Sequence, residues 1–322
     1  MIKLKNNIRC LVTGANGFLG SHLIDQLKKK KIKIYITSSK QNDLRDFYQV
    51  EKIFKKYKPQ IVFNLAAKVG GILDNKNKPA DYFFDNIQII SNTFELAKVY
   101  KVKKIINVGA GCGYPLNARE PLKEEDIFNG VPQKESIAYS TAKKMLFTAA
   151  EAYKRQYGLK SNVIIPSNLY GEYDNFNLKE SHVIPALVRK FYESTVNNRK
   201  EVKIWGDGSA KRDFIYARDV AKSLIYLCEY SNDINPVNIC TGSQVSIKQI
   251  AQKLSKISGF KGKVVWEKNM PEGQKSRSFS ISKLKKVLKN RHKKFTSIED
   301  GLRKTYEWFQ ANYKKNIRLW KI

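Results

Sequence analysis

Near the start of the chain stands the stretch Ile8-Arg-Cys-Leu-Val-Thr13, Gly14-Ala-Asn-Gly17-Phe-Leu-Gly20, Ser21-His-Leu-Ile-Asp-Gln-Leu27. Its first six residues are mostly apolar and predict a short buried strand. Leu23, Ile24 and Leu27 have the spacing of a helix that buries one face. Three glycines, each three residues apart, lie between the two elements. The stretch therefore predicts a strand, a tight turn and a helix.

The three glycines have different roles in such a turn. The first makes the turn, the second lets the backbone approach a pyrophosphate, and the third allows close packing of helix on strand. The helix N-terminus then offers free N–H groups to the phosphates. The glycine interval differs by one residue from the usual Gly-x-Gly-x-x-Gly, and the alternative is a turn with no ligand. The context favours a Rossmann unit that binds a nicotinamide dinucleotide.

The rest of the first half alternates between strands and helices. We predict strands at 32–37, 61–66, 104–108 and 162–166, and helices at 21–31, 48–57, 81–100 and 140–157. This order predicts an α/β fold with a doubly wound parallel sheet. Beyond about residue 170 the alternation stops, which indicates a smaller lobe. We expect a Rossmann domain at 1–170, with segments returning to it at about 207–245, and a substrate-binding lobe at 171–322. The later helices are expected at 181–193, 218–229 and 246–257, and the later strands at 202–205 and 264–267.

The formal net charge of +31 is extreme. It could serve a nucleic-acid or membrane partner. Because the lysines are dispersed and no aromatic-basic motif appears, we favour solvated lysine-rich faces that attract an anionic substrate. No apolar run approaches the roughly 20 residues of a membrane span, and the polar N-terminal segment predicts a cytoplasmic protein. The four cysteines, at 10, 112, 228 and 240, fit no metal-ligand spacing.

The residues after the second strand bear on the choice of cofactor. An acidic residue there would bind the ribose 2′-hydroxyl of NAD. Thr37-Ser38-Ser39-Lys40 stands there instead, and hydroxyls with a cation suit the 2′-phosphate of NADP. We therefore favour NADP(H) over NAD(H), although no arginine at 37–40 decides it. Asp43 and Leu44 are expected to cover the adenine, and the alternative for Asp43 is a helix N-cap.

Tyr139 and Lys143 begin the helix at 140–157. A spacing of four places both side chains on one helix face. A nearby ammonium favours the phenolate, so we expect Lys143 to lower the pKa of Tyr139 and the tyrosine to exchange a proton. Behind a phosphate loop, this pair indicates redox chemistry.

Further motifs follow the same order as in a known group of enzymes. With them the chain resembles the extended short-chain dehydrogenase/reductases over nearly its whole length, and within that group it is similar to the GDP-L-fucose synthases. The motifs are Ala66-Ala-Lys-Val-Gly-Gly71, Cys112-Gly-Tyr-Pro115, Pro166-Ser-Asn-Leu-Tyr-Gly171, Asp174-Asn-Phe176, Ser181-His-Val-Ile-Pro-Ala186, Trp205-Gly206, Arg212-Asp-Phe-Ile215 and Pro271-Glu-Gly273.

The resemblance implies a reaction. Such enzymes epimerise C3 and C5 of GDP-4-keto-6-deoxy-mannose and then reduce the C4 ketone with NADPH. Cys112 and His182 match the acid/base pair, Tyr139 would protonate the C4 oxygen, and Lys143 would also hold the nicotinamide ribose. From the residues alone, Cys112 could instead be an inert loop residue and His182 a capping or surface histidine.

The resemblance also implies binding residues and a homodimer that pairs the helices at 81–100 and 140–157. Asn86 and Lys68 are expected to brace the loops around the site. The expected substrate contacts are Gly111, Cys112, Asn168, Val183, Lys190, Trp205, Arg212 and Lys283. The expected cofactor contacts are Gly14, Asn16, Gly17, Phe18, Leu19, Ser38, Ser39, Lys40, Asp43, Leu44, Ala66, Ala67, Lys68, Tyr139, Lys143, Pro166, Asn168, Leu169 and His182.

One position departs from the family pattern. Ala110 stands where the family has a serine or threonine whose hydroxyl binds the C4 oxygen. Another donor could replace it (the Gly111 N–H or the Cys112 thiol), reduction could be slow, or the sugar could differ, for example a 6-deoxy-heptose. The alternative functions are a C4 reductase without epimerisation, a non-catalytic NADP-binding regulator and a basic nucleic-acid binder. A 4,6-dehydratase fits the loop at 109–112 less well.

Overall fold

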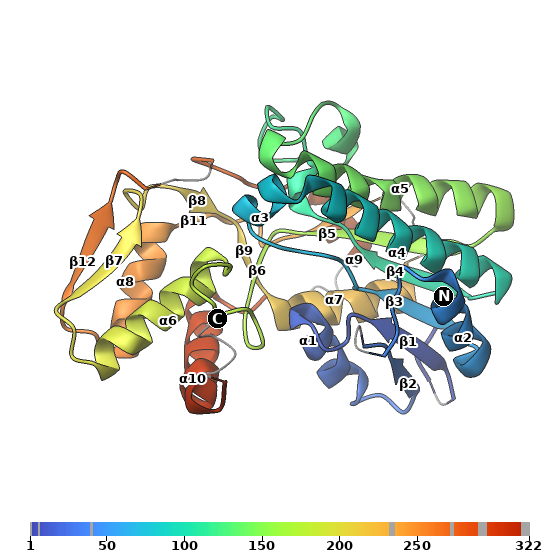
Figure 1. Ribbon diagram of the computed structural model, residues 1–322, viewed down its shortest axis with the longest axis horizontal. Helices are drawn as coiled ribbons and strands as arrows, with labels where there is room; N and C mark the ends of the chain where they lie inside the picture. The colour runs from blue at the N-terminus through green and yellow to red at the C-terminus, as the bar shows by residue number, and fades with distance from the viewer. Residues whose placement is uncertain are drawn as a thin grey trace.

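The computed structural model describes residues 2–5, 7–38, 41–231, 236–270, 274–288 and 295–316. Figure 1 shows a sheet domain joined to a smaller lobe that is built mainly from the second half of the chain. Ser39, Lys40 and the Pro271-Glu-Gly273 motif lie outside the described residues.

The sheet has six parallel strands in the order β10-β5-β4-β3-β1-β2. β2 pairs with one side of β1 and β3 with the other. The strand order therefore reverses at β1, and in open α/β sheets ligands bind at the carboxyl ends of the strands at such a point. The strands are β1 (Arg9–Thr13), β2 (Lys33–Ile36), β3 (Ile61–Asn64), β4 (Lys104–Val108), β5 (Lys160–Pro166) and β10 (Val237–Ile239).

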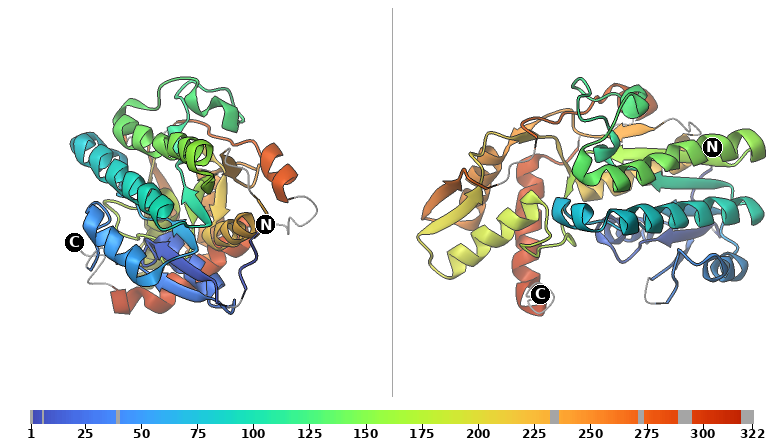
Figure 2. Two further views of the ribbon diagram at one scale, coloured as in Figure 1. Left: turned by 90° about the vertical axis from the view of Figure 1, so that its right-hand side faces the viewer. Right: turned by 45° about the horizontal axis from the view of Figure 1, so that its top comes forward.

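Helices cover both faces of this sheet (Figure 2). On one face, α2 (Phe47–Tyr57), α4 (Pro79–Val99) and α5 (Ile137–Tyr157) share one hydrophobic core with the strands, and Phe54 and Phe94 are fully buried in it. On the other face, α1 (Phe18–Leu27) and α7 (Ala217–Tyr230) share a second core. Burial on both faces explains why the strands are almost continuously apolar.

The lobe has a core of its own. Helices α6 (Val183–Val196), α8 (Ile247–Ser258) and α10 (Ile298–Asn316) pack together around Phe191 and Phe309. Figure 1 shows α6 and α8 beside a two-stranded parallel sheet of β7 (Glu201–Trp205) and β12 (Lys263–Glu267).

Two further strand pairs join the lobe to the sheet domain. β6 (Asn168–Tyr170) pairs in parallel with β9 (Phe214–Tyr216), and β8 (Lys211–Arg212) pairs antiparallel with β11 (Val245–Ser246). The buried Asp213 carboxylate, between β8 and β9, accepts hydrogen bonds from Ser167, from the amide and hydroxyl of Thr241, and from the Gly242 amide. These bonds tie β9 to the segment after β10.

The predicted α/β fold with a doubly wound parallel sheet is confirmed. Helix α1 begins at Phe18, three residues before the predicted start, because Gly17 already serves as its N-cap. The sequence analysis did not predict α10, the short β10, or the short helices α3 (Ile72–Asn77) and α9 (Ser282–Leu288).

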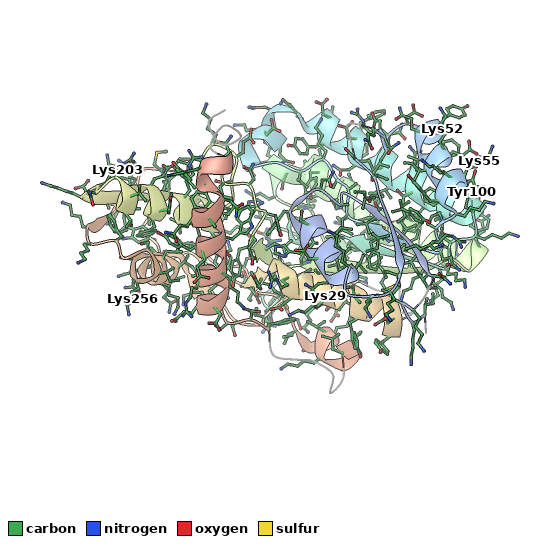
Figure 3. All side chains as sticks on the ribbon, turned by 90° about the horizontal axis from the view of Figure 1, so that it is seen from below. Lys29, Lys52, Lys55, Tyr100, Lys203 and Lys256 are labelled. Atoms are coloured by element: carbon green, nitrogen blue, oxygen red, sulfur yellow. The ribbon has the colours of Figure 1, made fainter. Side chains whose placement is uncertain are left out.

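The basic side chains are spread over the molecule. Figure 3 shows Lys52 and Lys55 on α2, and Lys203 and Lys256 on the lobe. None of the described helices combines the length and the apolar character that crossing a bilayer requires.

Candidate active site

One cleft of about 1150 Å³ runs from the carboxyl ends of β1 and β3 to the lobe. It exceeds the roughly 300–1,000 Å³ of a typical small-molecule pocket, so it has room for a dinucleotide and a second ligand. Most of the predicted site residues line it. Those lining it are Gly14, Asn16, Gly17, Phe18, Leu19, Ser38, Asp43, Leu44, Ala66, Ala67, Lys68, Gly111, Tyr139, Lys143, Pro166, Asn168, Leu169, His182, Val183, Lys190, Trp205 and Arg212.

The phosphate loop forms one end of the cleft. Gly14 has φ +67, and a Cβ there would lie 2.8 Å from the Ala66 nitrogen. A Cβ on Gly20 would collide with the Gly14 carbonyl oxygen. No side chain caps the N-terminus of α1. These positions accept only glycine, and the uncapped helix end fits the pyrophosphate of a dinucleotide.

Thr13 fixes this loop to the neighbouring strand. Its hydroxyl donates to the Asn64 side-chain oxygen at 3.0 Å and accepts from the Leu65 and Ala66 amides at 3.1 and 3.2 Å. The carboxyl ends of β1 and β3 are therefore held together where the cofactor is expected.

The adenosine end of the cleft contains an arginine that the sequence analysis missed. The guanidinium of Arg45 forms a fork with Asp43, with Nε–Oδ1 at 2.9 Å and Nη2–Oδ2 at 2.7 Å, and Nη1 reaches Asp85 at 3.0 Å. Arg45 holds the pKa of Asp43 below its usual value. The N-cap of α2 is Asp46, which accepts from the Gln49 amide, so the capping alternative for Asp43 is wrong.

Asn86 braces the loop after β3, as predicted. Its side chain accepts from the Lys68 amide at 3.2 Å and donates to the Lys68 carbonyl at 3.1 Å. The Lys68 ammonium is paired with Asp85 at 2.9 Å and Asp81 at 3.3 Å. The loop that carries Ala66 and Ala67 is thus anchored to α4.

Tyr139 and Lys143 lie in the first turns of α5 and line the middle of the cleft. Burial raises the pKa of Tyr139 and lowers the pKa of Lys143 to about 8. The prediction that Lys143 lowers the pKa of Tyr139 is therefore wrong for this structure, because loss of solvation disfavours both charged forms. Tyr139 keeps its proton at neutral pH, and a proton donor is what reduction of a ketone needs.

The loop after β4 closes the same region. Ala110 has extended backbone, and a 3-10 turn follows at Gly111–Gly113. Ala110 and Gly111 line the cleft, whereas Cys112 follows Gly111 without lining it, and a hydrogen bond joins its thiol to the Ser140 side chain. Burial raises the pKa of Cys112, while this hydrogen bond and the charges of Arg277 and Lys143 oppose the rise. Cys112 is partly exposed, and the other three cysteines are buried.

His182 occupies the N-cap position of α6 and is exposed, as the alternative interpretation expected, although its side chain makes no capping hydrogen bond. Its side chain lines the cleft, and partial loss of solvation at the cleft wall lowers its pKa. A neutral imidazole at pH 7 can accept a proton. Asn168 donates to the Asp213 carbonyl at 3.0 Å, which fixes it near the junction of sheet domain and lobe.

The lobe supplies the far wall. Trp205 is 50% exposed, and the Lys190 ammonium lies 6.0 Å from its ring centroid. Lys190 also donates to the Lys203 carbonyl at 2.9 Å. Arg212 extends from β8 into the same wall. An exposed indole with two cations is a surface suited to a nucleobase and phosphates.

Lys283 lies elsewhere. It belongs to α9, does not line the cleft, and acts electrostatically on Glu124. The basic side chain near the catalytic loop is Arg277, which donates to the Gly111 carbonyl at 2.9 Å. The sequence analysis missed Arg277, although it stands four residues after the Pro271-Glu-Gly273 motif.

The sequence matches the model of the NAD dependent epimerase/dehydratase family over residues 10–240. The chain belongs to this family. A GDP-L-fucose synthase from Sinorhizobium fredii is 34% identical over 308 residues, which cover 96% of this chain and 97% of that protein.

Solved structures agree with this assignment. A GDP-L-fucose synthetase from Naegleria fowleri bound to NADP has a TM-score of 0.92 at 30% identity, covering 97% of this chain and 96% of the other. A GDP-mannoheptose C4 reductase from Campylobacter jejuni with NADP bound has a TM-score of 0.85 at 29% identity, covering 96% of this chain and 100% of the other. The predicted resemblance to extended short-chain dehydrogenase/reductases and GDP-L-fucose synthases is confirmed, and so is the prediction of an enzyme.

Proposed function

We propose that the chain is an NADP(H)-dependent enzyme that epimerises C3 and C5 of a GDP-linked 4-keto-6-deoxy hexose or heptose and reduces its C4 ketone. The observation that carries the proposal is that one cleft brings the expected groups together. It joins a phosphate loop, the Tyr139/Lys143 pair and His182 to a lobe wall of Lys190, Trp205 and Arg212. The similarity to GDP-L-fucose synthases supports the same substrate class.

The cofactor end of the cleft favours NADP(H). The Asp43 carboxylate is already paired with Arg45, so it does not present a free negative charge to a 2′-phosphate. Ser38 lines the same wall and offers a hydroxyl. The bound cofactor would supply a hydride to the C4 carbon. Lys143 would hold its nicotinamide ribose, and the N-terminus of α1 its pyrophosphate.

The lobe would bind the GDP half of the substrate. Trp205 offers an exposed ring for stacking on guanine, and Arg212 offers a fork for the pyrophosphate. The sugar would then lie between the lobe and Tyr139. The high net charge would draw the anionic substrate toward the protein.

The protein side chains would then divide the proton transfers. The 4-keto group acidifies the C–H bonds at C3 and C5. One of Cys112 and His182 takes the proton, the electron pair moves to the C4 oxygen as an enolate, and the other returns a proton to the opposite face. Tyr139 finally donates its phenolic proton to the C4 oxygen as hydride arrives.

A C4 reductase without epimerisation, acting on a GDP-6-deoxy-4-keto-heptose, is the second candidate. Two observations favour it. Cys112 lies beside the cleft wall rather than in it, and the chain is similar to a GDP-mannoheptose C4 reductase.

Product analysis in deuterated water separates the candidates. The enzyme is incubated with a GDP-4-keto-6-deoxy sugar and NADPH that carries deuterium or tritium at its transferable position. Deuterium from solvent at C3 and C5 together with label at C4 supports the full reaction. Label at C4 alone supports the reductase, and absence of both contradicts an enzyme of this class.

We also propose a homodimer that pairs α4 and α5 of each subunit, as the resemblance implies. Both helices carry large exposed apolar side chains, among them Phe83, Phe84 and Val99 on α4 and Tyr157 on α5. Light scattering after gel filtration tests it. Phe84→Asp should convert a dimer to a monomer, and a monomeric wild type contradicts the proposal.

A further inference from the structure

Arg277 is a partly buried cation, and Glu120 is the carboxylate that acts on it electrostatically. Its guanidinium donates to the Gln274 side-chain oxygen at 2.6 Å and to the Gly111 carbonyl at 2.9 Å, and both acceptors are neutral. Within the described part of the chain it forms no ion pair. Burying a charge is costly unless an anion compensates it. The position of Arg277 therefore favours a further anion nearby, in addition to Glu120.

The segment that carries Arg277 is fixed to the catalytic loop. The Glu120 carboxylate accepts from the Ser278 amide at 2.9 Å and from its hydroxyl at 2.8 Å. Phe279 packs so closely on the loop that a Cβ on Gly111 would lie 2.8 Å from its ring. Arg277 is thus held behind the loop, and it does not line the cleft.

The charge of Arg277 acts on the thiol of Cys112. Cys112 follows Gly111, whose carbonyl Arg277 holds. Four neighbouring side chains interact with the thiol, namely Ser140, Arg277, Lys143 and Tyr139. Glu120 and Tyr114 also act on Arg277 itself. Of these, Arg277 and Lys143 are the cations, and Lys143 has its expected role at the cofactor.

We propose that Arg277 is a positioning residue that holds the Gly111–Cys112 turn and stabilises the thiolate of Cys112 for proton transfer. The inference rests on the proposed function only for what the thiolate does, namely to remove a sugar proton. Arg277 acts through Cys112, because it lies behind the wall that the substrate would touch.

The electrostatics agree with this geometry. Burial raises the pKa of Cys112, and the charge of Arg277 lowers it. Burial also lowers the pKa of Arg277, which the Cys112 charge opposes. An opposite charge at short range typically changes a pKa by about 1–3 units. Loss of Arg277 should therefore make the thiolate at least about tenfold rarer near neutral pH.

The rate of alkylation of Cys112 tests this in the full-length protein. Iodoacetamide is applied from pH 7 to about pH 11.5, in short pulses, and the modified peptide is quantified by mass spectrometry. The buried Cys10, Cys228 and Cys240 serve as internal references for folding. The midpoint of the profile reports the thiol pKa, and the plateau at high pH reports access to the thiol.

Three variants are compared with the wild type. Arg277→Gln should move the midpoint up by about one unit or more. Arg277→Lys, which keeps the charge, should restore most of the difference. Lys275→Gln, which removes an exposed charge from the same segment, should leave the profile unchanged. An unchanged midpoint in Arg277→Gln, or equal shifts in Arg277→Gln and Lys275→Gln, would overturn the proposal.

Isotope exchange supplies the second measurement. In Arg277→Gln, solvent deuterium incorporation at C3 and C5 should fall by at least about tenfold, while NADPH affinity stays within twofold of wild type. A protein that turns over no GDP-sugar contradicts the proposed function, whereas the alkylation profile still decides the role of Arg277.

Discussion

The two ends of the cleft are built in different ways. The cofactor end is made of backbone: Gly14 and Gly20 lie where no side chain fits, and the N-terminus of α1 is uncapped. The lobe end is made of long side chains, Lys190, Trp205 and Arg212, on three separate elements. A backbone site recognises phosphates that many ligands share, and a side-chain site can change with the sugar nucleotide. Variants at the two ends should therefore affect different steps.

The largest effect is expected from Tyr139→Phe, in the middle of the cleft. Loss of the proton donor should slow C4 reduction by about 10²–10⁴-fold. NADPH affinity, measured by fluorescence titration, should stay near wild type, because the phosphate loop is untouched. Reduction at more than a tenth of the wild-type rate would exclude Tyr139 as the donor.

Ala110→Ser tests the missing hydroxyl. A preorganised donor at such a site is typically worth about 10²–10³ in rate, so NADPH oxidation with a 4-keto GDP-sugar should rise by at least about tenfold. Gly111→Ser is the control, since its Cβ would lie 2.8 Å from the Phe279 ring, and it should lower the rate. If the rate of NADPH oxidation does not rise in Ala110→Ser, the absence of a hydroxyl at position 110 does not limit C4 reduction.

Arg212→Gln tests the lobe end alone. Loss of a charged fork to the pyrophosphate should cost about 1.5–3 kcal/mol of binding, which is a rise of about ten- to a hundredfold in KM for the GDP-sugar. The affinity for NADPH should not change. A parallel loss of NADPH binding would mean that the two ends are not independent.

The pH dependence of hydride transfer reports Lys143. Burial lowers its pKa to about 8, so its ammonium is present below that pH and lost above it. Single-turnover reduction should be constant below about pH 7 and decline as the pH rises through 8. A rate that stays flat to pH 9.5 contradicts a role for the charged lysine.

The smallest effect is expected at the adenosine end. Arg45→Gln leaves the Asp43 carboxylate unpaired beside the expected 2′-phosphate. Half-exposed ion pairs are worth about 0.2–1 kcal/mol, so the preference for NADPH over NADH should fall about two- to fivefold. Arg303→Gln, in an exposed ion pair on α10, is the control. An unchanged preference for NADPH over NADH in Arg45→Gln would contradict a role of Arg45 in cofactor selection.

The elements of the sheet domain were predictable because each has a local pattern. The strands around the phosphate loop are apolar runs bounded by glycine or charged residues. Helix α10 also has a local signal that the sequence analysis missed, since Leu302, Tyr306 and Phe309 are buried at helical spacing. By contrast, the three residues of β10 become a strand only by pairing with β5, more than 70 residues earlier, and no local pattern marks such a partner.

The features of the candidate site also fall into two groups, those that the local sequence determines and those that depend on tertiary structure. Sequence by itself determined the phosphate loop, the Tyr139/Lys143 pair and the departure at Ala110, because these depend on backbone conformation and on spacing within one helix or turn. Tertiary structure alone decided that Arg277 rather than Lys283 reaches the catalytic loop. It also decided that Tyr139 keeps its proton. The reason is physical: solvation and distance between charges depend on everything that packs around a group, and residues far apart in the chain supply most of it.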